Sequence, residues 1–76
     1  MIKVTRYDGD VSSMWFASIK EAAAFVVESL EEEFEFVGHN HGNYPLPSEE
    51  EIVSSFERAG EYVYADTPAV SNYEVR

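Results

Sequence analysis

Two histidines lie close together in the polar stretch His39-Asn40-His41, near the middle of the chain. Imidazole nitrogens bind zinc and nickel, and a carboxylate such as Glu35 or Asp66 could complete a site of that kind. Loop histidines that lack a third fixed ligand are more often solvated residues. We therefore expect no metal or other cofactor, and keep His39 and His41 as candidates.

Carboxylates are the most abundant ionisable groups: fifteen Asp and Glu stand against five Lys and Arg, for a formal net charge of −10. Their spacing singles out no acid/base pair, and the familiar nucleophile, phosphate-loop and metalloprotease patterns are absent. The chain has no Cys, which excludes thiolate nucleophiles, disulfides and Cys-bound metals. We expect a protein that is not an enzyme.

The acids are concentrated in one part of the chain. From Glu21 to Glu57 there are ten glutamates and no Lys or Arg. Near the end of a helix, where the dipole is negative, an acid is unfavourable by about 0.3 to 1 kcal/mol. The candidate partner-binding acids lie in or near the first predicted helix: Glu21, Glu28, Glu31, Glu32, Glu33 and Glu35.

All of these acids except Glu33 fall opposite or beside the apolar stripe of that helix, which makes a one-sided row of carboxylates. Duplex DNA is also a dense line of negative charge, so such a row could occupy the basic groove of a nucleic-acid-binding protein. A solvated face that only provides solubility is the alternative. The two readings stay open.

The elements that must position these residues begin with a hairpin. Residues 2–7 and 11–17 are β-prone and flank an Asp8-Gly9-Asp10 turn. Ser18 and Glu21 then form a capping box, followed by apolar residues at helical spacing to about Glu33.

The stretch Phe34 to Val37 reads either as a short strand or as more of the same helix. A loop follows over residues 38–47. A second capping box at Ser48 to Glu51 starts a helix that ends at Gly60. Residues 61–66 and 72–76 then read as two strands.

The fold class predicted from this order is α+β. Residues 1–76 form one domain, in which an antiparallel sheet of two hairpins carries both helices on one face. The order is β-β-α-(β)-α-β-β, with about four strands and a fifth left open at Phe34 to Val37.

Eleven aromatic residues are more than a core of this size readily holds. Strict alternation puts Val63 and Ala65 on one side of their strand, and leaves Tyr7, Trp15, Tyr62 and Tyr64 on the opposite sides of theirs. If the helices cover the side of Val63 and Ala65, these four rings line an open face of the sheet. Trp and Tyr often anchor interfaces, so Trp15, Tyr62 and Tyr64 are candidate partner-binding residues. Packing on one another as cross-strand pairs is the alternative.

The N-terminal residues lack an apolar signal region, and no stretch is long enough for a membrane span, so we expect a soluble cytoplasmic protein. Its negative charge argues against binding nucleic acid or anionic membranes directly.

Our first hypothesis is a non-enzymatic protein that binds and inhibits a basic, nucleic-acid-binding partner, as a nucleic-acid mimic. In size and in the cluster "ESLEEEFE" the chain resembles the class of small acidic inhibitors made by phages and mobile elements, such as anti-CRISPR and anti-restriction proteins. The alternative is a small structural or regulatory module that self-associates, as a homodimer, through the aromatic sheet face.

Overall fold

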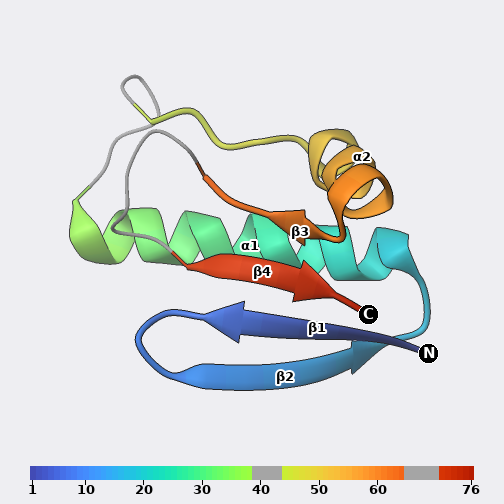
Figure 1. Cartoon of the computed structure of the whole chain (residues 1–76). Coiled ribbons are helices and arrows are strands. Elements are labelled where there is room, and N and C mark those ends of the chain that lie inside the picture. Colours follow the sequence, from blue (N-terminus) through green and yellow to red (C-terminus); the bar gives the residue numbers. More distant parts are fainter. Residues whose placement is uncertain (39–43, 65–70) are drawn as a thin grey trace.

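The computed structural model describes residues 1–38, 44–64 and 71–76. They form a four-stranded antiparallel sheet with two helices packed on one face, which confirms the predicted α+β class (Figure 1). The strands follow the spatial order β2-β1-β4-β3. In chain order the elements are β1 (Ile2–Tyr7), β2 (Val11–Phe16), α1 (Ile19–Val37), α2 (Glu49–Ala59), β3 (Glu61–Tyr62) and β4 (Asn72–Val75).

The first hairpin forms as the sequence predicts. The six residues of β1 pair with those of β2 without a bulge, from Ile2 opposite Phe16 to Tyr7 opposite Val11. Gly9 adopts φ 100° in the turn, a region that side chains disfavour, and the Asp8 carboxylate accepts from the backbone N–H of Asp10 at 3.2 Å.

The first and last strands meet in the middle of the sheet. The backbone groups of Lys3 and Arg76 exchange two hydrogen bonds of 3.0 and 2.8 Å, and β4 pairs antiparallel with β3 on its other side. The second predicted hairpin is therefore confirmed as a strand pair, although β3 is only two residues long.

Helix α1 begins at the predicted capping box. The Ser18 hydroxyl accepts from the Glu21 N–H at 3.2 Å, while the Glu21 carboxylate reaches back to the N–H of Ala17 at 3.1 Å. The helix runs to Val37, so Phe34 to Val37 is helix and not a fifth strand. Phe34 decides this, because it continues the buried stripe one turn beyond Leu30.

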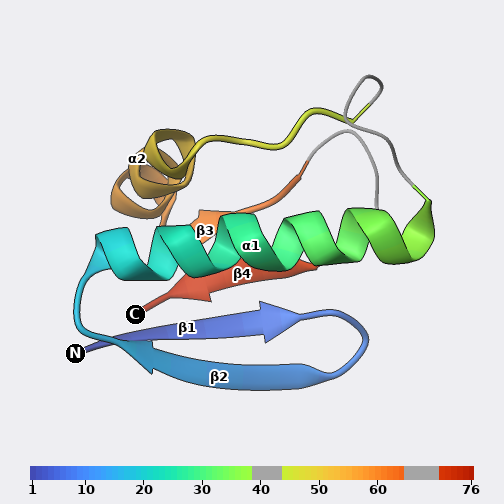
Figure 2. The ribbon, with the colours of Figure 1, turned by 180° about the vertical axis from the view of Figure 1, so that it is seen from behind.

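Helix α2 is delimited by the predicted residues. The Ser48 hydroxyl accepts from the Glu51 N–H at 3.2 Å, and Gly60 ends the helix with φ 72°. Seen from behind, α1 runs along the strands of the sheet, with α2 beside its N-terminal half (Figure 2). Among the described residues, no helix combines the length and the apolar content that crossing a membrane would require.

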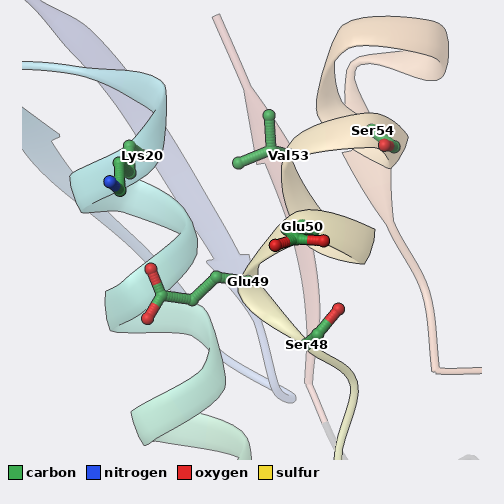
Figure 3. Close-up of a pocket in the computed structure, with 6 residues that line it drawn as sticks. All are labelled: Lys20, Ser48, Glu49, Glu50, Val53 and Ser54. Carbon is green, nitrogen blue, oxygen red and sulfur yellow. The ribbon is translucent and has the colours of Figure 1, made fainter.

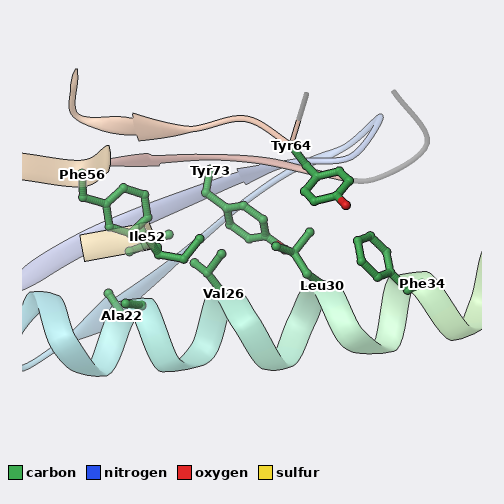
Figure 4. Packing of buried hydrophobic residues seen from close by; sticks show 10 residues of the cluster. Ala22, Val26, Leu30, Phe34, Ile52, Phe56, Tyr64 and Tyr73 are labelled. Carbon is green, nitrogen blue, oxygen red and sulfur yellow. The ribbon is translucent and has the colours of Figure 1, made fainter. Parts of the chain in front are cut away.

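The core lies between α1, α2 and the covered face of the sheet (Figure 4). Tyr73 of β4 is its largest fully buried side chain, and Ile52 and Phe56 of α2 pack beside it. The fully buried residues of α1 recur at three- and four-residue spacing: Ala22, Ala23, Val26, Leu30 and Phe34. This stripe fixes which side of α1 faces water.

Candidate functional site

The water-facing side of α1 carries the row of acids predicted from the sequence. Its members are all exposed, and we call them the acidic face: Glu21, Glu28, Glu31, Glu32 and Glu35. The last turn of α1 holds no basic residue. Glu21 is explained by its capping bond, but the other members have no such local role.

Glu33 is the predicted partner-binding acid that lies elsewhere. Its carboxylate turns toward the sheet, with a side chain only 15% exposed, and lies 3.3 Å from the guanidinium of Arg6. The same carboxylate accepts from both the N–H, at 3.1 Å, and the hydroxyl of Ser71. Glu33 therefore ties α1 to β1 and to the residue just before β4.

Tyr73 completes this group of residues from inside the core. Its hydroxyl lies 3.2 Å from the Glu33 carboxylate, to which it donates, and 2.9 Å from the Ser29 hydroxyl. We call Arg6, Ser29, Glu33, Ser71 and Tyr73 the Glu33 cluster. No buried side-chain nitrogen or oxygen of the described residues lacks a hydrogen-bond partner. The cluster is thus a satisfied structural network.

The chemistry of the cluster agrees with a structural role. Burial of the ring raises the pKa of Tyr73 to about 12. The nearby Glu33 charge also raises this pKa, whereas the hydrogen bond with Ser29 lowers it by less than burial raises it. The phenol therefore stays protonated and donates at neutral pH. By alternation, Arg6 lies on the same, covered side of β1 as Ile2 and Val4. A charged residue on a covered face needs a partner of opposite charge, so Arg6 was the sign in the sequence that one acid turns inward.

Beside the Glu33 cluster, the end of α1 and the first hairpin border a hollow of about 430 Å³. Glu32 and Phe36 contribute to its wall. Phe36 is 92% exposed, so an apolar ring stands next to the acidic face. This ring was not among the residues selected from the sequence, because its exposure depends on α1 continuing beyond Glu33.

A second hollow, of about 640 Å³, lies between the first turns of α1 and α2 (Figure 3). Lys20 lines one side, and Glu49 and Glu50 line the other. These glutamates belong to the first turn of α2, where the helix dipole favours acids. Their presence is explained by α2, and the hollow suggests no particular chemistry.

The aromatic residues are divided between the two faces of the sheet. Trp15 and Tyr7 lie on the face away from the helices, 60% and 38% exposed. Tyr64, in contrast, is buried, with its ring 5.2 Å from that of Phe34 and its hydroxyl donating to the Pro45 carbonyl at 2.9 Å.

Tyr62 likewise packs against the core, because it pairs with the inward-facing Tyr73, and Val63 is 50% exposed. The predicted placement of Tyr62 and Tyr64 on the open face is therefore wrong. The chain buries the larger rings and exposes Val63, since an aromatic ring removes more apolar area from water.

The structure also separates Trp15 from the acidic face. The open face of the sheet and the outer side of α1 look in opposite directions, with the core between them. One flat partner surface could not contact both.

The histidine hypothesis falls on residues 39–43, which lie outside the described part of the chain, as does Asp66. Within the part that is described, no group of three His, Asp or Glu side chains is arranged to hold a metal ion.

No family model, no curated protein and no solved structure matches this chain.

Proposed function

We propose that this chain is a non-enzymatic binding protein whose acidic face occupies the basic, nucleic-acid-binding surface of a partner protein and so inhibits it. The partner is a cytoplasmic protein that binds DNA or RNA, of the kind opposed by phage and mobile-element inhibitors. The acidic face acts as a mimic of the phosphate row of a nucleic acid.

The observation that supports this most is the spacing of the exposed acids. Four of them fall between positions 28 and 35 of α1. At about 1.5 Å per residue this segment is roughly 10 Å long. Along the helix axis its four carboxylates are therefore about 3.5 Å apart on average. A single strand of duplex DNA carries one charge per about 3.4 Å of axis. A basic groove that reads a phosphate row would find a similar linear charge density.

The acidic face is also held rigidly. The opposite side of α1 is fully buried from Ala22 to Phe34, and the Glu33 cluster fixes its C-terminal half to the sheet. A row of charges on a fixed helix loses less conformational freedom on binding than the same charges on a flexible tail.

Phe36 gives the acidic face an apolar neighbour, at the wall of the 430 Å³ hollow. Phe36, and not Trp15, is therefore the aromatic residue that could contact the same partner surface as the acids, because Trp15 lies on the far side of the molecule. Aromatic residues often supply the affinity of an interface whose charges supply its orientation and association rate.

Capture from a bacterial lysate tests the proposal. The immobilised protein should retain nucleic-acid-binding proteins at about 0.05 M salt and release them at about 0.5 M, because salt screens exposed charge pairs. Replacing Glu28, Glu31 and Glu32 by Gln should abolish this capture.

The matched control replaces three exposed acids outside α1, Glu50, Glu57 and Glu61, by Gln. Both variants carry a net charge of −7, which is −10 plus three neutralised acids. If both lose the partner equally, or if the unmodified protein retains no nucleic-acid-binding protein, the proposal is wrong.

A further inference from the structure

The two edges of the sheet differ in how they are protected against further pairing. The β3 edge is two residues long and carries Glu61. The β2 edge is six residues long and reads VSSMWF, with no charge and no proline. Its pairing with β1 is continuous, so it also lacks a bulge. Short strands, charges, prolines and bulges are the usual protections of a sheet edge.

The hydrogen bonds of the sheet show which groups of β2 point outward. Lys3 exchanges both of its backbone hydrogen bonds with Arg76, so the odd residues of β1 point toward β4. The even residues of β1 therefore bond to β2, where their partners are Ser12, Met14 and Phe16. It follows that the backbone N–H and C=O groups of Val11, Ser13 and Trp15 point away from the sheet.

These residues also place their side chains on the open face of the sheet. Val11 is 68% exposed and Trp15 60% exposed, and Ser13 stands between them. The edge thus offers a row of backbone donors and acceptors beside two apolar side chains.

From this arrangement we propose that the protein forms a homodimer in which β2 of one copy pairs antiparallel with β2 of the second copy. Ser13 faces Ser13 of the second copy across the two-fold axis, and each Val11 lies opposite the other copy's Trp15. The two four-stranded sheets become one sheet of eight strands. This inference rests on β2 alone and is independent of the proposed function.

The distribution of charge favours a second copy as the occupant. Two chains of net charge −10 repel one another over most of their surface. Residues 11–17 contain no ionisable side chain, and the acidic face lies on the opposite side of the sheet layer. Pairing along β2 brings the copies together along a segment that carries no charge. It also places each exposed apolar side chain, Val11 or Trp15, opposite an apolar side chain of the second copy.

The test compares two identical substitutions, Ser13→Lys on β2 and Ser54→Lys on α2, both at exposed serines. Sedimentation of the full chain, from about 1 μM to 1 mM, gives the dissociation constant of the dimer. We expect a dimer whose dissociation constant rises by on the order of tenfold or more in Ser13→Lys, because two lysines then face each other across the axis. Ser54→Lys should leave it unchanged.

Net charge does not explain such a result, because both substitutions lower the repulsion, from −10 to −9. Amide hydrogen exchange of the unmodified protein gives an answer even if Ser13→Lys fails to fold. The amides of Val11, Ser13 and Trp15 should gain protection as concentration rises, while those of Ser12, Met14 and Phe16 are protected throughout. A monomer at every concentration, a dimer indifferent to Ser13→Lys, or unprotected odd-numbered amides in the dimer would each overturn the proposal.

Discussion

The Glu33 carboxylate on α1 and the Arg6 guanidinium on β1 lie 3.3 Å apart and join segments that are 27 residues apart in the chain. This ion pair distinguishes Glu33 from the neighbouring glutamates, which look the same in the sequence. Glu33 stabilises the fold, whereas Glu31 and Glu32, its neighbours, are exposed and free to contact a partner.

Glu33→Ala should destabilise the protein by about 1 to 3 kcal/mol, because the donors of Ser71 lose their acceptor and the partly buried Arg6 keeps only Asp8 as a carboxylate partner. Urea unfolding measures the loss. Glu32→Ala is the control, since removal of an exposed side chain should change stability by at most about 0.5 kcal/mol. Equal losses in the two variants would show that the Glu33 cluster does not stabilise the fold.

Glu35→Lys should stabilise the protein by about 0.3 to 1 kcal/mol, because it puts a cation in the last turn of α1, where no basic residue is present. The new lysine would also follow Glu31 at the favourable four-residue spacing. Glu49→Lys makes the same change in the first turn of α2 and should destabilise the protein by a similar amount.

Unfolding of these two variants in urea measures whether the acids of α1 stabilise or destabilise the helix. Opposite signs would mean that α1 keeps its acids against its own stability, so that their role lies outside the helix. A loss of stability in Glu35→Lys would instead mean that Glu35 supports the fold.

The Tyr73 phenol should make the protein less stable in alkali. Its pKa is about 12 in the folded protein and about 10 when exposed, so below pH 10 both states hold the proton. Between about pH 10 and 12 only the unfolded state loses it. The free energy of unfolding should therefore fall over this range, by on the order of 2 to 3 kcal/mol.

Tyr73→Phe isolates this effect from the titration of other groups. At pH 8 the variant should be less stable than the parent, by about 1 kcal/mol, because it loses the hydrogen bonds to Ser29 and Glu33. Urea unfolding at several pH values should show the difference shrinking and then reversing as pH rises. A constant difference would mean that the phenol titrates alike in both states.

Local signals predicted the elements of the fold well. Both helices begin at the serines expected, Ser18 and Ser48, whose hydroxyls accept from the N–H three residues on, and the Asp8-Gly9-Asp10 turn sets the register of the first hairpin. The end of α1 needed tertiary information. The sequence left Phe34 to Val37 open between a short strand and more of the helix, and the packing of the buried Phe34 ring against Tyr64 favours the helix.

The candidate site was harder to predict, because burial depends on distant parts of the chain. Five acids of the acidic face lie where the helical projection puts them, but only the position of Arg6 shows that Glu33 turns inward. Tyr62 and Tyr64 were assigned to the wrong face because β3 has two residues, too few for alternation to fix its orientation.

Competition with nucleic acid tests the central claim most directly. A partner captured by this protein would be purified, and displacement of its labelled DNA or RNA by added protein would be followed by fluorescence anisotropy. We predict displacement at about 0.05 M salt, where exposed charges are least screened. It should be lost in the Glu28, Glu31, Glu32 to Gln variant but kept in the Glu50, Glu57, Glu61 to Gln control. A partner that holds its nucleic acid at every concentration of the protein, or that is displaced equally by both variants, would contradict the account.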